Sequence, residues 1–136
     1  MGLVLDTCVF IQAERKDTDF DFKRWNKEDD IYISTITVSE LLMGVHNANT
    51  ESRRLKRSAF VEAIISGISV LDFTSEAARI HAELYVSLSK KGNIIGSHDL
   101  IIAATALSQG YSILTSNHEE FNRIPGLNVF SFNDLI

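Results

Sequence analysis

The sequence predicts an α/β fold in which helices flank a central, mainly parallel sheet of about five strands. Short apolar segments recur along the chain, and longer segments with apolar residues at helical spacing separate them. Parallel strands need a crossover connection, which is usually a helix, so this alternation predicts a parallel sheet covered on both faces. The length of 136 residues suits one hydrophobic core. We therefore expect a single domain over residues 1–136.

The composition is that of a globular protein. Hydrophobic residues make up 45% of the chain and charged residues 23%, which excludes a disordered chain. No apolar run approaches the roughly 20 residues that cross a bilayer, and Asp6 interrupts the opening apolar segment before it could act as a signal peptide. Cys8 is the only cysteine, so no intramolecular disulfide can form. We expect a cytoplasmic protein without a membrane segment.

The first strand is predicted at Leu3 to Leu5, because a short and wholly apolar run suits a strand buried on both faces. Asp6 and Thr7 follow it and can cap a helix. Asp17 to Asp30 mixes charges with aromatic residues at helical spacing, which predicts an amphipathic helix. The second strand is predicted at Ile31 to Ile33.

Two more helices and a third strand follow in the prediction. Ser34 and Thr35 can cap a helix that carries Glu40. A longer helix is predicted from Glu51 to Ile68, and a strand at Ser69 to Leu71. The residues expected on the inward face of the longer helix are Leu55, Ala59, Phe60, Ala63 and Ile64.

The second half of the chain continues the alternation. Thr74 begins a helix that Gly92 ends. A strongly apolar helix is predicted from about Asp99 to Ser108, stopped by Gly110, and the fourth strand at Ser112 to Leu114.

The chain end is predicted to hold one short helix and one strand. The helix lies near Glu119 to Arg123, and Pro125 breaks the chain direction after it. The fifth strand is predicted at Asn128 to Phe130.

Polar side chains stand beside four of the apolar segments. Asp6 follows the first strand, and Glu40 lies on a helix. Asp99 leads into the most apolar helix, and Asn117 follows the fourth strand. Since the carboxyl ends of parallel strands meet at one edge of the sheet, Asp6 and Asn117 are expected to share that edge. Oxygen ligands of this kind suit one or two Mg²⁺ or Mn²⁺ ions, which activate water against phosphate groups.

Each acid also has a purely structural alternative. Asp6 and Asp99 could cap their helices, and Glu40 could be a solvated helix residue. Independent caps have no reason to recur at every position of one site, so the combination favours a functional pocket. His98 is expected to be a local hydrogen-bonding residue. The net charge of -5 argues against a broad basic surface, and the basic run from Arg53 to Arg57 is interpreted either as a solvated helix face or as a guide for RNA.

Four segments together resemble the PIN-domain signature. They are residues 3–7 (LVLDT), 37–41 (TVSEL), 97–104 (SHDLIIAA) and 114–117 (LTSN). The chain resembles VapC-type toxin nucleases over nearly its whole length. That resemblance implies a PIN-like fold and a Mg²⁺- or Mn²⁺-dependent endoribonuclease of a type II toxin–antitoxin pair. It also implies a homodimer, a cognate antitoxin as partner, and transfer RNA as one class of RNA substrate.

The resemblance also implies which residues form the site. The family's catalytic and metal-binding acids map onto Asp6, Glu40 and Asp99, and its fourth position maps onto Asn117. An amide has no charge, so Asn117 is expected to bind the metal through its carbonyl oxygen or to orient a metal-bound water. Glu120 lies one helical turn further on and could compensate as a ligand.

Two rival functions stay open from the sequence. One is a noncatalytic RNA- or protein-binding PIN module, in which Asn117 reflects a weakened metal site. The other is a metal-dependent phosphatase or DNA nuclease, because the same acids serve several phosphate reactions.

Overall fold

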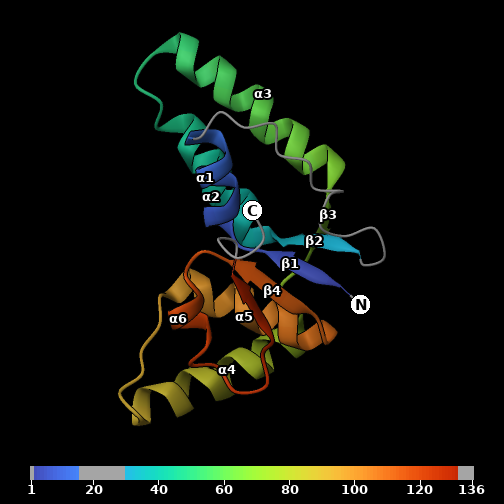
Figure 1. The fold of residues 1–136 in the computed structure, drawn as a ribbon, viewed down its shortest axis with the longest axis vertical. Helices are drawn as coiled ribbons and strands as arrows, with labels where there is room; N and C mark the ends of the chain where they lie inside the picture. The colour runs from blue at the N-terminus through green and yellow to red at the C-terminus, as the bar shows by residue number, and fades with distance from the viewer. Residues whose placement is uncertain (1, 16–29, 132–136) are drawn as a thin grey trace.

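A computed structural model describes residues 2–15 and 30–131 of the chain (Figure 1). The elements are β1 (Leu3–Leu5), α1 (Thr7–Arg15), β2 (Ile31–Ser34), α2 (Thr35–His46), α3 (Glu51–Gly67), β3 (Ser69–Leu71), α4 (Ser75–Lys90), α5 (Ser97–Gln109), β4 (Ser112–Thr115), α6 (His118–Phe121) and β5 (Val129–Ser131). All five predicted strands form. The helix expected over Asp17 to Asp30 falls almost wholly outside the described residues.

The five strands form one sheet in the order β3-β2-β1-β4-β5, and every neighbouring pair is parallel. This confirms the α/β fold with a parallel sheet. The register pairs Val4 with Ile113 and Leu5 with Leu114. From β1 the chain moves outward through β2 to β3 and then returns to β4 on the other side of β1. The connections diverge between β1 and β4, which is where open α/β sheets form a ligand crevice.

Side chains from the two faces of the sheet enter two hydrophobic clusters. Val4 and Ile113 belong to the cluster that α4, α5 and α6 cover, whereas Leu5 and Leu114 belong to the one that α1, α2 and α3 cover. Successive residues of a strand point to opposite faces, so neighbouring positions on β1 and β4 divide between the two clusters. Figure 1 shows the two groups of helices on opposite sides of the sheet.

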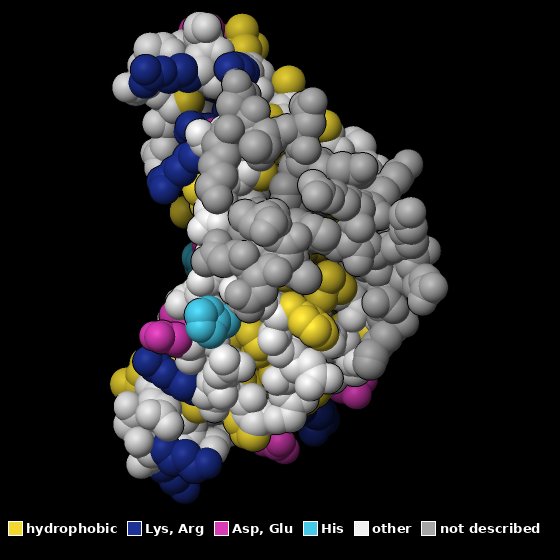
Figure 2. Space-filling view, viewed as in Figure 1, with side chains coloured by type: hydrophobic (Ala, Val, Ile, Leu, Met, Phe, Trp, Pro, Cys, Tyr) yellow, Lys and Arg dark blue, Asp and Glu magenta, His cyan; other side chains and the backbone are white. Residues whose placement is uncertain are grey.

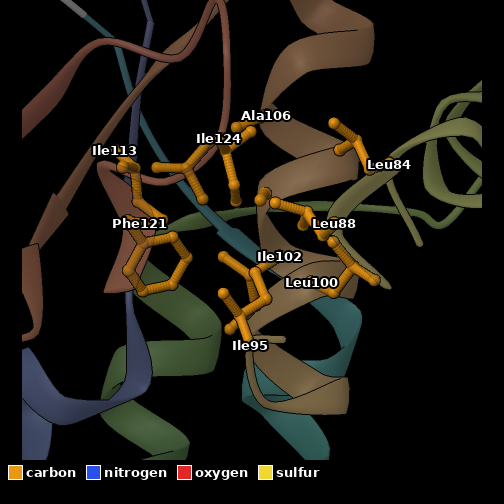
Figure 3. Close-up of a cluster of buried hydrophobic side chains, with 11 residues drawn as sticks. Leu84, Leu88, Ile95, Leu100, Ile102, Ala106, Ile113, Phe121 and Ile124 are labelled. Atoms are coloured by element: carbon orange, nitrogen blue, oxygen red, sulfur yellow. The ribbon is translucent and has the colours of Figure 1, made fainter. Parts of the chain in front are cut away.

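One residue of the first cluster fixes the short helix α6. Phe121 is fully buried, and Figure 3 shows its ring beside Ile113 of β4, with Ile102 of α5 facing it. Burying an aromatic side chain contributes roughly 1.5–3 kcal/mol. A helix of four residues is unstable by itself, so this packing is what holds α6 at the end of β4.

The helix ends agree with the capping residues read from the sequence. Ser34 Oγ accepts a hydrogen bond from Ile36 N at 3.2 Å at the start of α2, and Thr74 Oγ1 accepts one at the start of α4. Gly110 ends α5 with a φ of 72°, a backbone conformation that favours glycine. In the described part of the chain, no helix is long and apolar enough to cross a membrane.

The inward face predicted for α3 is wrong in part. Leu55 is 58% exposed, and Ala59 and Ala63 are exposed as well. The most buried side chains of α3 are Val61 and Ile64, so only its second half enters the core. The apolar pattern alone could not reveal that the first half of α3 extends beyond the sheet (Figure 1).

Candidate active site

Asp6 and Asn117 lie at the same edge of the sheet, as the strand pattern predicts. Asp6 comes directly after β1, and its backbone N–H donates to Leu114 O at 2.9 Å. Asn117 follows β4, the strand paired with β1. The two residues therefore flank the point where the connections of the sheet diverge.

The Asp6 carboxylate is buried and held by three donors. It is 4% exposed. Its Oδ1 accepts from Thr7 N at 2.8 Å, and its Oδ2 accepts from Thr115 Oγ1 at 2.8 Å and from Cys8 Sγ at 3.0 Å. Burial raises the pKa of Asp6, and these three hydrogen bonds act in the opposite direction. Thr7 N is the first backbone N–H of α1, so Asp6 also satisfies one of the free donors at the start of that helix.

Cys8 takes part in this arrangement as a neutral thiol. Burial and the neighbouring Asp6 charge raise the pKa of the Cys8 thiol above its ordinary value. A protonated sulfur can donate to Asp6 but is a poor nucleophile. Cys8 therefore supports the carboxylate.

Glu40 is held between two other elements of the fold. Its Oε1 accepts from Thr7 Oγ1 at 2.7 Å, and its Oε2 lies 3.3 Å from His98 Nδ1. These contacts join α2 to the starts of α1 and α5. The solvated-residue alternative for Glu40 is thereby excluded, and His98 is the local hydrogen-bonding residue that the sequence predicts.

Sequence reasoning did not single out Thr37, which supports the same contact. Thr37 is fully buried, and its Oγ1 lies 3.0 Å from Thr7 Oγ1. It stands three residues before Glu40 on α2, so both side chains lie on one face of the helix. The signal in the sequence that could have identified Thr37 is a hydroxyl residue one helical turn before a candidate acid.

Among these acids, the Asp99 side chain is the one that no hydrogen bond holds in place. It lies in the first turn of α5, and no hydrogen bond joins its side chain to another described residue. The helix begins at Ser97, earlier than predicted, with Gly96 at the cap position, so Asp99 does not cap it. Burial, followed by the charges of Asp6, Glu120 and Glu40, raises the pKa of Asp99 to about 7. Asp6, after β1, and the acids on α2 and α6 are therefore close enough to Asp99 for their charges to act on it.

Asn117 and Glu120 contact each other at the start of α6. Asn117 Nδ2 donates to Glu120 Oε2 at 2.6 Å. Glu120 Oε1 accepts from the backbone N–H of Gly96, just before α5. Asn117 N donates to Thr115 Oγ1 at 2.9 Å, and that hydroxyl donates to Asp6. Hydrogen bonds thus link Asp6 to Asn117 through Thr115 and link Asn117 to Glu120. Asp99 is linked to Asp6, Glu40 and Glu120 by the effect of their charges on its pKa.

The donor set fits a hard divalent cation, although the side chains do not form a ready-made centre. Within residues 2–15 and 30–131, no group of three His, Cys, Asp or Glu side chains is arranged to hold a metal ion. Mg²⁺ often takes only one or two carboxylates, because water and phosphate complete its coordination. A cation would also relieve the repulsion that raises the pKa of Asp99.

Residues 3–127 match the PIN domain family. The chain belongs to the PIN domain family. It is 41% identical to Ribonuclease VapC1 of Rickettsia felis over 131 residues, with 96% of each chain covered. It is 34% identical to the tRNA(fMet)-specific endonuclease VapC of Salmonella typhimurium, over 95% of this chain and 96% of that protein. Within the PIN domain family, the chain is a VapC ribonuclease.

A solved structure supports the assignment of this PIN domain to the VapC ribonucleases. VapBC2 of Rickettsia felis, bound to a DNA fragment from its promoter, superposes with a TM-score of 0.87 at 29% identity. The superposition covers 97% of this chain and 99% of that one. The PIN-like fold and the ribonuclease class expected from the sequence are therefore confirmed.

Many of the basic side chains visible in Figure 2 gather toward the two ends of the molecule. Figure 2 shows Lys and Arg at the two ends of a concave edge of the molecule, with acidic and His side chains between them. In the basic run of α3, Arg54 pairs with Glu51, and Arg57 donates to Glu14 Oε1 and Gly44 O, each at 3.0 Å. Two charges of this run thus serve contacts within the protein.

Proposed function

We propose that this VapC ribonuclease is a metal-dependent endoribonuclease toxin of the cytoplasm, in which Asp6, Glu40 and Asp99 hold Mg²⁺ or Mn²⁺ and Asn117 completes the site. One observation carries this proposal. Asp99 has no hydrogen-bond partner among the described residues, and burial together with neighbouring carboxylates raises its pKa to about 7. An acid in that state releases its proton readily when a cation arrives.

The bound ion would act as a Lewis acid on the RNA phosphate and lower the pKa of its bound water. The chain's own residues supply the positioning. Asp6 is kept in one orientation by Thr7, Cys8 and Thr115, so it loses little freedom when it binds a cation. Glu40 is oriented by Thr7.

The substrate and partner are proposed by similarity. The Salmonella typhimurium relative is a tRNA(fMet)-specific endonuclease, which supports transfer RNA as the substrate of this chain. The solved Rickettsia felis relative is a VapBC complex, which supports a cognate antitoxin. We also infer a homodimer from the family, which light scattering on the purified protein would measure.

Cleavage of purified transfer RNA by the wild type, Asp6→Asn and Asp99→Asn in Mg²⁺, Mn²⁺ or EDTA tests the proposal. Both substitutions remove a charge with little change of shape, so we expect the rate to fall about 100-fold or more while the far-UV circular dichroism stays the same. Glu119→Gln removes one exposed charge from α6 and should cleave at the wild-type rate. Wild-type rates in both Asp variants would refute the assignment.

The noncatalytic PIN module remains the second candidate, because no group of three described acid, His or Cys side chains forms a metal centre. Binding of transfer RNA without cleavage in every metal condition would favour it. Competition by DNA or by a phosphomonoester would separate the DNA nuclease and phosphatase alternatives from the ribonuclease.

A further inference from the structure

Two pairs of exposed basic side chains lie on two different helices. They are Arg53 and Lys56 on α3, which we call the α3 pair, and Lys90 and Lys91 at the end of α4, which we call the α4 pair. We propose that the two pairs hold phosphates of one RNA molecule, so that the RNA spans the concave edge of the protein and crosses the acids in between. The inference rests on the proposed function, because it takes transfer RNA as the ligand.

A protein of this composition needs local basic clusters to bind RNA. Its net charge is -5, and the acids of the candidate site repel the phosphates that must reach them. Figure 2 shows Lys and Arg side chains over α3 at one end of the concave edge and over the end of α4 at the other, with acidic and His side chains between them. Phosphates held at both ends would bring the RNA to the acids in spite of this repulsion.

The charges of both pairs are available to a ligand. Among the described residues, no hydrogen bond or ion pair involves the side chain of any lysine in the two pairs. Arg53 donates from Nη1 to Asn49 Oδ1 at 3.0 Å, which leaves its other N–H groups without a partner in the described chain. Arg54, beside it on α3, is paired with Glu51 instead. The α3 and α4 pairs are therefore the exposed charges that the fold itself does not use.

The α3 pair is carried on a part of the helix that is held in place. Arg53 and Lys56 lie three residues apart on α3, so their side chains share a face of the helix. The next residue, Arg57, fixes this part of α3 to two other helices: it donates from Nε to Glu14 Oε1 on α1 and from Nη1 to Gly44 O on α2, each at 3.0 Å. Phosphate binding would therefore cost little ordering of the helix.

The α4 pair is likewise fixed relative to the site. Lys90 is the last residue of α4 and Lys91 its cap residue, where positive charges also complement the helix dipole. No described backbone carbonyl accepts from either ammonium group. Arg123 Nη1 donates to Ile94 O at 2.9 Å, which ties the loop after the pair to the segment that follows α6. The pair therefore stands at the start of the loop that leads to α5.

RNA suits two separated basic pairs better than an acidic protein segment does. Phosphates recur along the whole of a nucleic acid, so one molecule offers a charge to each pair whatever its base sequence. The chain is also a VapC ribonuclease, and an RNA phosphate must lie at the acids if it is to be cleaved. An acidic protein would need two groups of carboxylates spaced to match the pairs.

Binding without cleavage tests the inference. The Kd of the full-length protein for fluorescein-labelled transfer RNA would be measured by fluorescence anisotropy in EDTA over a range of salt concentrations. The proteins are the wild type, the Arg53→Gln, Lys56→Gln double variant and the Lys90→Gln, Lys91→Gln double variant. We expect about tenfold weaker binding in each double variant. The slope of log K against log salt should fall by about 1.5, because each phosphate contact contributes roughly 0.7–0.9.

Arg79→Gln is the control for the single variants Lys56→Gln and Lys91→Gln. Arg79 is exposed near the start of α4, at the other end of the helix from the α4 pair. Each lysine variant should bind about threefold more weakly and lose about 0.8 from the salt slope. Arg79→Gln should change the Kd by less than about 1.5-fold and keep the slope. All of these side chains are exposed, so the far-UV circular dichroism should be the same in every variant.

Four results would overturn the inference. If only one pair affects the Kd, the RNA does not span the concave edge. An unchanged salt slope in both double variants would show that neither pair binds phosphate, and a wild type without affinity for transfer RNA would refute the proposal outright. If the wild type binds a polyglutamate peptide and the double variants lose affinity for that peptide alone, the pairs serve an acidic protein instead.

Cleavage in Mg²⁺ keeps the inference distinct from the proposed function. The double variants should raise the KM for transfer RNA about tenfold and keep kcat within about twofold, because phosphates held away from the reacting bond bind equally in the ground and transition states. A fall in kcat with an unchanged KM would contradict this role. A wild type that binds transfer RNA without cleaving it would refute the proposed function, and the anisotropy measurements would still decide whether the two pairs hold RNA.

Discussion

Thr115 Oγ1 donates a hydrogen bond to Asp6 Oδ2 over 2.8 Å and so joins two residues that lie 109 positions apart in the sequence. The same hydroxyl accepts from Asn117 N at 2.9 Å. Thr115 is fully buried at the end of β4. One hydroxyl therefore fixes the central acid of the site relative to the segment that carries Asn117.

Replacing this hydroxyl should affect the site more than the fold. Thr115→Val keeps the shape of the side chain but removes a donor to Asp6 and an acceptor for Asn117. We expect Mn²⁺ affinity and the cleavage rate to fall about tenfold, as for other partners of metal ligands. Calorimetry and a transfer RNA cleavage assay would measure the two effects.

Thr105→Val is the matched control. Thr105 is also fully buried, and its Oγ1 donates to Ile101 O at 2.8 Å within α5. Thr105→Val loses one hydrogen bond and should lose about 0.5–1.5 kcal/mol of unfolding free energy, and Thr115→Val, which loses two, about 1–3 kcal/mol. Thr105→Val should nevertheless cleave at the wild-type rate. Equal cleavage by both variants would show that the Thr115 hydroxyl serves stability alone.

The raised pKa of Asp99 predicts how pH acts on the metal-free protein. The pKa of Asp99 is about 7 in the folded state against an ordinary value of 3.8. The folded state therefore holds this proton more tightly, so stability should fall as the pH rises from about 4 to about 7 and then level off. Melting temperatures in EDTA across this range would measure the fall, which Asp99→Asn should reduce.

The pH dependence of stability can also be tested with a control variant and with added Mg²⁺. Glu62→Gln removes an exposed carboxylate from α3 and should keep the wild-type pH profile. Mg²⁺ binds the ionised carboxylates, so it should stabilise the protein more at the upper end of the range. A wild-type slope that persists in Asp99→Asn would contradict the assignment of the proton to Asp99.

Gly2 is expected to tolerate no side chain. A Cβ on Gly2 would lie 2.6 Å from the Tyr111 ring, and that ring is stacked on Tyr32 with centroids 4.9 Å apart. Because the ring cannot move without disturbing this stack, Gly2→Ala should cost about 1–3 kcal/mol of unfolding free energy. Chemical denaturation would measure the loss.

Gly67 is the control for Gly2, with an effect of opposite sign. Gly67 ends α3, and no atom lies within 4 Å of a Cβ placed there. Gly67→Ala should stabilise the protein by about 0.5–1 kcal/mol, because alanine restricts the unfolded chain. Equal unfolding free energies for both alanine variants would mean that the contact with Tyr111 does not limit position 2.

The order of the elements follows from local sequence patterns. Apolar runs of a few residues predict the five strands, and capping residues such as Ser34, Thr74 and Gly110 predict helix ends that the structure confirms. These features depend on neighbours in sequence, so the sequence is enough to find them. The face that α3 buries is different, because it depends on where the helix crosses the sheet: the apolar pattern predicts Leu55 on the inward face, and the structure exposes it.

The sequence by itself also determined that Asp6 and Asn117 come together, because they follow neighbouring strands whose pairing brings them to one edge of the sheet. Only the tertiary structure decided how these residues are held. The bonds from Thr115 to Asp6, from Thr7 to Glu40 and from Gly96 to Glu120 join separate segments of the chain. Hydrogen bonds depend on distances of a few ångströms, and spacing along the chain does not fix such distances until the sheet and its helices pack.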